Sequence, residues 1–390
     1  MHEPIVRIAA RGDGVTPSGR HVPFAVPGDV LLDDGALAPG PHHQEPPCRH
    51  FPECGGCQLQ HADDEAYRDY LVSRIESALF QHQLSTEIRE PHLSPPYSRR
   101  RASLRAQKGA SGAFVGFNEE KSHRIVDMRE CHILRPELFA LVEPLRALLA
   151  PMLPTRGQAE IRLTLIDNGP DLEIRRIRGG GGLAAVEKLT SFALSHRLAR
   201  LSIDEGLGAE TIFEPEPSSI TLSGVPVHFP VGGFLQATKD GEKALVACVE
   251  EAVGRASLVG DLFAGLGTFA LALGSSYAAE ASRDASTALQ RAAPSMIVEH
   301  RDLYRRPLDR SELKRFDAIV LDPPRAGAAE QVRALAGSTV QKIAYVSCNP
   351  ATFARDAKVL VEGGHSLRWI RPVGQFRWST HVELAASFSR

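Results

Sequence analysis

The pattern of apolar and polar positions is most regular in the last third of the chain. From Gly241 onward, short apolar runs alternate with amphipathic stretches, which is typical of β/α units. The runs are mostly free of charged residues, as expected for parallel strands that are buried on both faces. We therefore predict a doubly wound α/β domain of the Rossmann-like kind over residues 236–390. Its predicted strands lie at 257–263, 277–279, 297–298, 316–321, 342–346 and 384–388, with helices at 242–253 and 269–273.

The first residues show a different pattern, in which short β-like runs are separated by Gly, Pro and Asp. The runs at 5–10 and 22–26 predict a small N-terminal β-module over residues 1–45, of the OB or TRAM type. A hairpin that packs on the main body would give the same pattern. A linker rich in Pro and His, residues 39–47, closes this part of the chain.

The central part of the chain mixes the two periodicities. Tyr67, Leu71, Ile75 and Leu79 recur at helical spacing and predict a helix over residues 65–81. We assign this stretch to a central α+β domain over residues 46–235. Further helices are predicted at 138–149 and 189–199, and strands at 160–166 and 172–177.

Composition and charge exclude several classes of protein. The chain has 390 residues, 43% hydrophobic and 24% charged, with a net charge of −2. It contains no apolar run near the ~18 residues of a membrane span and begins without an apolar signal core. We expect a cytoplasmic monomer that has no membrane partner. Since the chain as a whole is not basic, any site for a polyanion must be local.

One local excess of positive charge is present. Ten Lys and Arg against five Asp and Glu lie between Arg89 and Arg135. Arg99, Arg100, Arg101 and Arg105 are the densest part of it. This pattern predicts phosphate contacts of the kind that position a nucleic acid without reading its sequence. A solvated strand face would look the same.

Four of the six cysteines suggest a metal site. Cys48, Cys54 and Cys57 lie on one short loop with two glycines between the second and third, and Cys131 supplies the fourth thiol. Disulfides are disfavoured in a reducing compartment. Four thiolates suit either structural zinc or an iron–sulfur cluster, and the spacing alone does not decide between them. The default role of either is structural.

The strand ends of the α/β domain carry cofactor chemistry. A glycine-rich turn, with Phe263, Gly265 and Gly267, follows the first strand, and such turns let a cofactor approach the backbone. Asp261 before the turn and Glu280 at the end of the second strand supply a carboxylate to grip a ribose. Asp302 follows the third strand and Asp322, in an Asp-Pro-Pro-Arg turn, the fourth. The series is that of an S-adenosylmethionine-dependent methyltransferase, because an NAD-binding domain does not explain the Asp-Pro-Pro turn.

The fifth strand ends in Ser-Cys-Asn-Pro and places Cys348 at the carboxyl edge of the sheet. Open α/β folds place their chemistry at this edge, so Cys348 is a candidate nucleophile. A buried free cysteine is the alternative reading. Glu383 follows a turn just ahead of the closing strand, where it is available as a base or is simply a surface acid.

These motifs together carry a family resemblance over most of the chain. The cysteine loop, Phe234-x-Gln236, the glycine turn, Asp-Pro-Pro-Arg, Ser-Cys-Asn-Pro and His-Val-Glu occur in the order seen in the RNA 5-methyluridine methyltransferases. The chain most resembles the branch that methylates 23S ribosomal RNA and carries a 4Fe–4S cluster. The resemblance implies a nucleophile at Cys348 and a base at Glu383. It implies cluster ligands at Cys48, Cys54, Cys57 and Cys131, and places Gln236, Phe263, Gly265, Gly267, Glu280, Asp302 and Asp322 around S-adenosylmethionine and the target base.

Three functions follow from this reading. The first is C5 methylation of a uridine in ribosomal RNA, in which the thiolate adds to C6, the methyl group is transferred to C5, and a base removes the C5 proton. The second is the same chemistry on tRNA or another RNA. The third is a non-catalytic iron–sulfur protein that binds RNA, against which the intact Cys348 and Glu383 argue.

Overall fold

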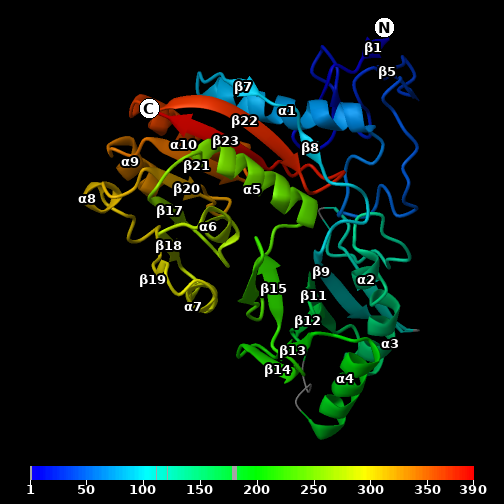
Figure 1. The fold of residues 1–390 in the computed structure, drawn as a ribbon. Coiled ribbons are helices and arrows are strands. Elements are labelled where there is room, and N and C mark those ends of the chain that lie inside the picture. Colours follow the sequence, from blue (N-terminus) through cyan, green and yellow to red (C-terminus); the bar gives the residue numbers. More distant parts are fainter. Residues whose placement is uncertain (1, 111, 121, 178–181) are drawn as a thin grey trace. The chain divides into compact units, whose positions relative to one another are not determined.

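The computed structural model describes residues 2–110, 112–120, 122–177 and 182–390, which form two compact units (Figure 1). The first unit is made of Met1–Pro47, Cys57–Ser94 and Asp240–Arg390. The second is made of Cys48–Gly56 and Pro95–Lys239. The second unit is therefore inserted in the chain of the first. None of the described helices is long and apolar enough to cross a membrane.

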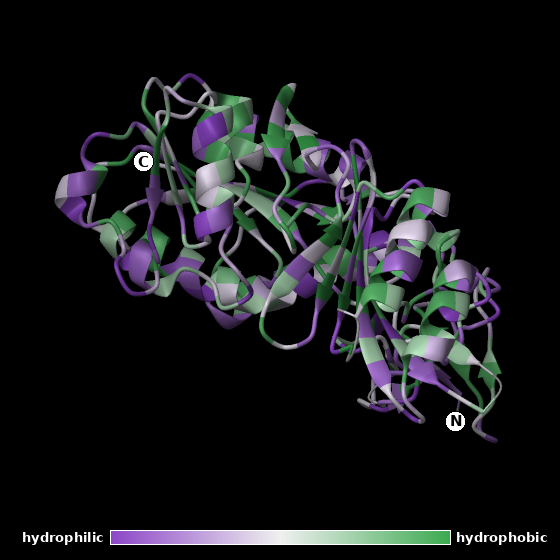
Figure 2. Cartoon of the chain, turned by 90° about the horizontal axis from the view of Figure 1, so that it is seen from below, coloured by the Kyte–Doolittle hydropathy of each residue, from purple (hydrophilic) through white to green (hydrophobic). Residues whose placement is uncertain are grey.

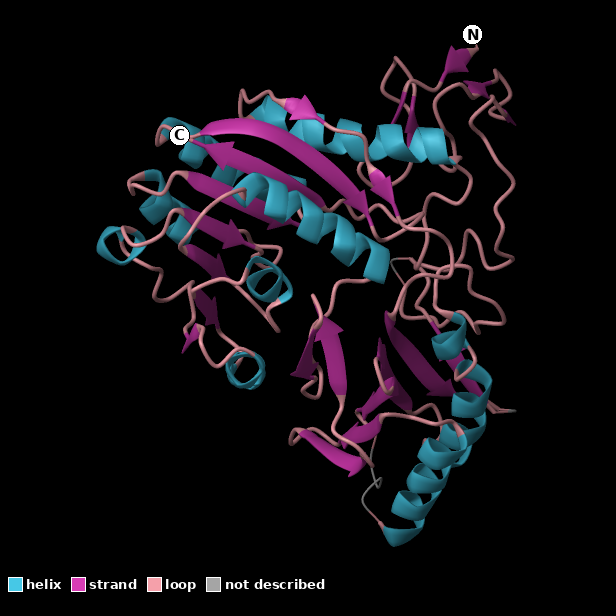
Figure 3. Ribbon diagram, viewed as in Figure 1, coloured by secondary structure: helices cyan, strands magenta, loops and turns pink. Residues whose placement is uncertain are grey.

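The first unit contains a nine-stranded, mostly parallel sheet (Figure 3). Its central strands are parallel, and the closing strand β23 runs antiparallel between β21 and β22. The strand order is β19-β18-β17-β20-β21-β23-β22-β7, with β8 also paired to β22. The bounds are β7 (Glu87–Ile88), β8 (His92–Leu93), β17 (Val259–Leu262), β18 (Tyr277–Glu280), β19 (Ile297–His300), β20 (Ala318–Leu321), β21 (Lys342–Ser347), β22 (Ser366–Gly374) and β23 (Leu384–Ser389). The order reverses between β17 and β20, so the predicted doubly wound domain is confirmed.

Helices cover both faces of this sheet because its strands are apolar on both sides. In β20, Ile319 and Leu321 belong to a core with helices α1, α9 and α10, whereas Ala318 and Val320 belong to a second core with α5. Figure 2 shows hydrophobic and hydrophilic residues alternating along the helices. This mixture is expected for a helix that packs one side on a sheet and exposes the other side to water. The helix bounds are α1 (Asp64–Gln81), α5 (Lys239–Val253), α6 (Thr268–Leu273), α7 (Arg283–Ala292), α8 (Arg310–Leu313), α9 (Ala329–Ala336) and α10 (Pro350–Glu362).

Helix α1 forms where the periodicity predicts it, but the domain to which we assigned it is wrong. Tyr67, Leu71 and Ile75 are fully buried in the core of the first unit, together with Phe353 of α10 and Ile370 of β22. Asp63 caps the helix by accepting a hydrogen bond from the backbone N–H of Ala66 at 2.8 Å. Residues 57–94 therefore belong to the first unit, because the apolar side of α1 packs into the core of that unit.

The N-terminal residues form the small β-module that the sequence predicts, within the first unit rather than as a compact unit of its own. Asp29 is fully buried and holds the module together. Its carboxylate accepts hydrogen bonds from the backbone of Val26 at 2.9 Å and of Gly40 at 2.7 Å, and meets the ring of His43 at 2.8 Å. The module has two three-stranded sheets, made of β1 (Glu3–Pro4), β5 (Val30–Leu31) and β6 (Leu37–Ala38), and of β2 (Arg7–Ile8), β3 (Gly14–Val15) and β4 (His21–Val22).

The second unit is an α+β fold around a six-stranded sheet in the order β10-β9-β11-β12-β13-β14. One set of side chains, including Leu104, Ile161 and Leu172, joins helices α3 and α4 in an apolar core. Glu160, Arg162 and Glu173 belong instead to a set of ion pairs between the same strands. The bounds are β9 (Arg101–Lys108), β10 (Ala113–Gly116), α2 (Pro136–Phe139), α3 (Val142–Met152), β11 (Gln158–Ile166), β12 (Gly169–Arg175), α4 (Leu183–Ser195), β13 (Arg200–Asp204), β14 (Ala209–Phe213), β15 (Ser219–Leu222) and β16 (Val225–His228).

The hydroxyl of Tyr67 gives a test of how α1 is held. It donates toward the backbone oxygens of Phe376 at 3.0 Å and Ser379 at 3.2 Å, in the loop that leads to Glu383. Tyr67→Phe should lower the free energy of unfolding by about 1 to 3 kcal/mol, because two buried acceptors lose their donor. Phe80→Leu is the control on the same helix. Phe80 is 82% exposed, so the change should cost less than about 0.5 kcal/mol in the same denaturant titration.

Candidate active site

Two antiparallel strands bring the segments that carry Cys348 and Glu383 together. Strand β21 pairs with β23 from Lys342↔Ser389 to Ser347↔Leu384. Cys348 comes directly after the last paired residue of β21, and Glu383 comes directly before the first residue of β23. The negative charge of Glu383 acts on the pKa of Cys348, so the predicted nucleophile and the predicted base lie within interaction range of each other.

The carboxylate of Glu383 is held by a glutamine that our sequence analysis missed. Gln375 donates a hydrogen bond from Nε2 to Glu383 Oε2, and both residues are buried. The backbone N–H of Val373 donates to the Glu383 carbonyl at 2.8 Å, which fixes the start of β23. The only sequence signal for Gln375 is its place just after the apolar run that ends at Val373. The reading of Glu383 as a surface acid is wrong, since its exposed fraction is 5%.

The turn that carries Cys348 is tied to the Asp-Pro-Pro-Arg turn. Asn349 caps helix α10, since its side chain accepts a hydrogen bond from the backbone N–H of Ala351 at 3.1 Å. Its Nδ2 donates to the carbonyl of Arg325 at 3.0 Å, and the hydroxyl of Thr352 donates to the same oxygen at 3.1 Å. The ends of β20 and β21 are thus held together, because one carbonyl receives two side-chain donors.

Charges around Cys348 act on its thiol in opposite directions. Burial raises the pKa of Cys348 above its usual value, and the negative charges of Glu383 and Asp322 raise it further. The positive charge of Arg325 lowers the pKa and offsets part of this effect. Cys348, Glu383 and Asp322 are therefore close enough to interact, and the cysteine is a thiol rather than a thiolate near neutral pH.

The glycine turn after β17 has a backbone that suits the close approach of a ligand. Phe263, Gly265 and Gly267 all have positive φ, at 65°, 56° and 92°. A Cβ built on Gly265 would meet no other atom within 4 Å, whereas one on Gly267 would lie 2.4 Å from Leu289. Gly267 is therefore required by helix packing, and Gly265 leaves open space beside the turn.

Of the two acids predicted to grip a ribose, Asp261 is buried and Glu280 is partly exposed at the end of β18. Asp261 is fully buried, and burial raises its pKa to about 8, so it lies in the protein as a neutral acid. The prediction for Asp261 is wrong because its strand is covered on both faces. Glu280 is half-buried and accepts hydrogen bonds from the backbone of Gly265 at 2.9 Å and of Ser282 at 2.6 Å. It joins the glycine turn to the end of β18.

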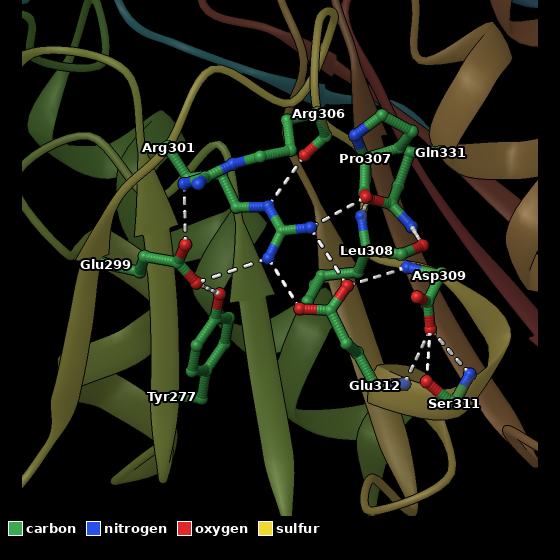
Figure 4. A network of polar contacts seen from close by, with 10 residues as sticks. All are labelled: Tyr277, Glu299, Arg301, Arg306, Pro307, Leu308, Asp309, Ser311, Glu312 and Gln331. Carbon is green, nitrogen blue, oxygen red and sulfur yellow. Dashed lines mark hydrogen bonds and ion pairs between the residues drawn. The ribbon is translucent and has the colours of Figure 1, made fainter.

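A network around Arg301 fixes the loop that carries Asp302 (Figure 4). The buried guanidinium makes two hydrogen bonds to Glu312, at 2.7 and 2.9 Å, and one to Glu299 at 3.3 Å. It also donates to the carbonyl oxygens of Arg306 at 2.6 Å and Pro307 at 2.7 Å. Because the donors of one planar group hold both ends of the loop, residues 302–307 have a defined course.

That loop presents a second residue that the sequence analysis missed. The ring of Tyr304 lies 5.6 Å from the ring of Phe263, centroid to centroid, and its hydroxyl donates to the carbonyl of Gly327 at 3.0 Å. Asp302 accepts from the backbone N–H of Tyr304 at 2.9 Å. An aromatic residue after Asp302 is the only signal in the sequence.

Gln236 and the arginine-rich stretch lie in the second unit. Arg100 is buried, and its Nε donates to the carbonyl of Gln236 at 3.0 Å, so the phosphate-contact interpretation is wrong for Arg100. Arg105 pairs with Glu160 at 3.2 Å. Arg101 lies over the exposed ring of Phe234, 4.1 Å from its centroid. This pair is the part of the stretch with the character of a nucleic-acid contact, since bases stack on aromatic rings and on guanidinium groups.

The cysteine loop meets the segment around Cys131 within the second unit. The Arg49 backbone N–H donates to Glu130 at 2.6 Å, and the ring of His50 accepts from the Arg129 backbone at 2.8 Å. Burial raises the pKa of Cys54 to about 11, with smaller increments from Cys131 and Cys48, so these three thiols interact.

These thiols have the right chemistry for a metal, and Cys54 interacts with Cys48 and Cys131. Among residues 2–110, 112–120, 122–177 and 182–390, no three or more His, Cys, Asp or Glu side chains form a group that could hold a metal ion. Cys57, the third cysteine of the loop, is buried and belongs to the first unit. The donor set thus fits a thiolate-bound metal in kind, and the metal stays a prediction.

Comparison with known proteins agrees with this fold. The sheet order and the glycine turn define the fold of the S-adenosylmethionine-dependent methyltransferases. A tRNA (uracil-5-)-methyltransferase family model matches residues 293–390. A relative from Zymomonas mobilis, described as an uncharacterized RNA methyltransferase, is 51% identical over 99% of each chain. The 23S rRNA (uracil(1939)-C(5))-methyltransferase of Photorhabdus laumondii is 29% identical over 91% of this chain and 84% of its own.

A solved structure shows the same fold. The tRNA (uracil-54, C5)-methyltransferase of Pyrococcus abyssi, in complex with S-adenosyl-L-homocysteine, matches with a TM-score of 0.77 at 22% identity, over 100% of this chain and 99% of that one. The relative from Zymomonas mobilis shows the family: the chain belongs to a family of RNA methyltransferases, and residues 293–390 match the tRNA (uracil-5-)-methyltransferase model. It is an S-adenosylmethionine-dependent enzyme.

The charges around Cys348 predict how its reactivity depends on pH. Because its pKa is raised, the thiolate fraction should still be growing between about pH 6.5 and 8.5, and alkylation by iodoacetamide should quicken by about tenfold per pH unit. Glu383→Gln should raise the rate at a fixed pH, since it removes a negative charge, and Arg325→Gln should lower it. Peptide-resolved mass spectrometry would measure Cys348 separately from the other cysteines. A rate that does not change with pH below about 8 would contradict this account.

Proposed function

We propose that this protein methylates C5 of one uridine in 23S ribosomal RNA, with Cys348 as the nucleophile and Glu383 as the base. The observation that supports the proposal is the pairing of β21 with β23, which ends directly beside Cys348 and Glu383, together with the effect of the Glu383 charge on the Cys348 thiol. S-adenosylmethionine supplies the methyl group. The relative from Photorhabdus laumondii, which aligns over 91% of this chain, supports ribosomal RNA as the substrate.

Cys348 is proposed to begin the reaction. C5 of uracil is a poor nucleophile, so the thiolate adds to C6 and moves an electron pair through C5=C6 to the O4 enolate. C5 of this enolate then attacks the methyl carbon, and the methyl–sulfur bond breaks with its electrons on the sulfur of the donor. The target uracil must leave the stack of the RNA helix to reach Cys348, as nucleobases do in other enzymes that modify them.

Glu383 is proposed to complete the reaction. C5 now carries both the methyl group and its original hydrogen, and the enzyme stays bonded through C6. The Glu383 carboxylate removes the C5 proton, the electron pair re-forms C5=C6, and the Cys348 thiolate leaves. Gln375 keeps the carboxylate turned toward this position through its hydrogen bond to Oε2. Asp322 is placed to contact the edge of the uracil.

The two residues can be separated by the step that each one blocks. Cys348→Ala should form no product and no covalent adduct, because C5 is never activated. Glu383→Gln should add the thiolate and transfer the methyl group but not release the product. A methylated protein–RNA adduct that survives denaturation should therefore accumulate from labelled S-adenosylmethionine. Sequencing the RNA trapped from total cellular RNA would identify the substrate.

The trapping experiment also decides between the alternatives. Adducts at one uridine of 23S ribosomal RNA are the expected result, and adducts on tRNA would overturn the choice of substrate. Wild-type turnover in Glu383→Gln would remove Glu383 from the mechanism. Full activity in Cys348→Ala would remove the whole proposal, and a wild-type protein that binds RNA without methylating it would favour the non-catalytic alternative.

We further propose that Cys48, Cys54, Cys57 and Cys131 hold a structural 4Fe–4S cluster. Three of these thiols interact within the second unit, and the Arg49–Glu130 contact joins the two segments that carry them. Four thiolates suit a 4Fe–4S cluster. Three clustered cysteines with one distant cysteine favour such a cluster, whereas zinc sites more often use two pairs of closely spaced cysteines.

Anaerobic purification tests the cluster. We expect a brown protein with about four iron and four sulfide per chain. Cys131→Ser should lower the iron content, whereas Cys248→Ser should not, since Cys248 is buried in the core around α5 of the first unit. Stoichiometric zinc without iron in the anaerobic preparation would overturn the proposal in favour of a zinc site.

A further inference from the structure

The aromatic pair Phe263 and Tyr304 stands where the methyl donor must come to lie. Phe263 belongs to the glycine turn after β17, and Tyr304 to the loop after β19. The rings are tilted by 56° at a centroid distance of 5.6 Å. Tyr304 is 43% exposed, although its hydroxyl is bound to Gly327. A ring held at its far end, with much of its surface open, is available to a ligand.

Electrostatics connect Tyr304 to the reacting thiol. Burial raises the pKa of Tyr304, and Asp356, Asp302 and Cys348 raise it further, whereas Arg355 lowers it. The ring therefore lies within interaction range of the carboxylates of Asp302 and Asp356 and of Cys348. Such surroundings favour a cation beside the ring over a neutral group.

The chemistry places a cation here. Cys348 bonds to C6 of the target base, the methyl acceptor is the neighbouring carbon C5, and reacting atoms must approach to roughly 3 to 3.5 Å. The positively charged sulfur of S-adenosylmethionine must therefore lie near Cys348. The glycine turn that would hold the donor carries Phe263, so the sulfonium falls between the turn and the thiol.

We propose that the Phe263–Tyr304 pair binds the sulfonium through cation–π contact and thereby distinguishes S-adenosylmethionine from the neutral product S-adenosylhomocysteine. The inference rests on the proposed function, and it names a recognition element of that same site. After methyl transfer the sulfur is no longer charged, so the rings lose their attraction for the product. The Arg301 network holds the Tyr304 loop in the required place before the ligand arrives (Figure 4).

The test compares binding of the two ligands to full-length protein without RNA. Wild-type protein should bind S-adenosylmethionine more tightly than S-adenosylhomocysteine in calorimetric titrations. Tyr304→Leu should reduce that preference by about two- to tenfold, chiefly by weakening S-adenosylmethionine. Tyr304→Phe should keep the preference, because it retains the ring and loses only the hydrogen bond to Gly327. Thermal melts of each variant would confirm that the fold is retained.

The outcomes separate this inference from the proposed function. An unchanged ratio of dissociation constants in Tyr304→Leu would overturn the inference, as would an equal loss for both ligands. A loss of preference in Tyr304→Phe as large as that in Tyr304→Leu would also overturn it, since the hydroxyl rather than the ring would then matter. None of these results depends on RNA, whereas trapped RNA adducts test the proposed function alone.

Discussion

The pairing of β21 with β23 is the constraint on which the candidate active site depends. An antiparallel ladder fixes which residues stand opposite each other, and a slip of one position would turn every side chain to the other face. Here the ladder ends at Ser347↔Leu384, directly before Cys348 on one strand and directly after Glu383 on the other. Two residues that are 35 positions apart (383 − 348) in the chain are thus brought within interaction range. The surrounding loops affect the pKa of Cys348 and the orientation of Glu383, but the strand pairing decides that these two residues meet.

The surroundings of Cys348 favour its protonated thiol. Burial and the negative charges of Glu383 and Asp322 raise the pKa of the cysteine, and Arg325 lowers it and offsets part of that effect. A protonated thiol is a weak nucleophile and a poor target for oxidation. Arrival of a positively charged donor beside Cys348 would favour the thiolate, so activation of the nucleophile would be linked to occupation of the donor site.

Local features were predictable from the sequence, and partnerships across the fold were not. The helix at α1, the strand ends that carry Glu280, Asp302 and Asp322, and the Cys348 turn all follow from periodicity and turn residues. Gln375 has no motif, because its role comes from facing Glu383 across a hairpin. The unit to which α1 belongs was also missed. An amphipathic stripe shows that a helix is covered on one side but does not show by what.

The position of β23 within the sheet has a consequence for synthesis on the ribosome. This strand is among the last residues of the chain, yet it lies inside the sheet, with β21 on one side and β22 on the other. Until it has emerged, β21 and β22 each lack a neighbour along one edge, and unpaired edges of apolar strands invite association with other chains. The last residue of the inserted second unit, Lys239, precedes the strands β17 to β23 of the main sheet, so the chain of that unit is complete before they are made. The sheet therefore stays incomplete until residues 384–389 have been made, because β21 and β22 are joined only through β23.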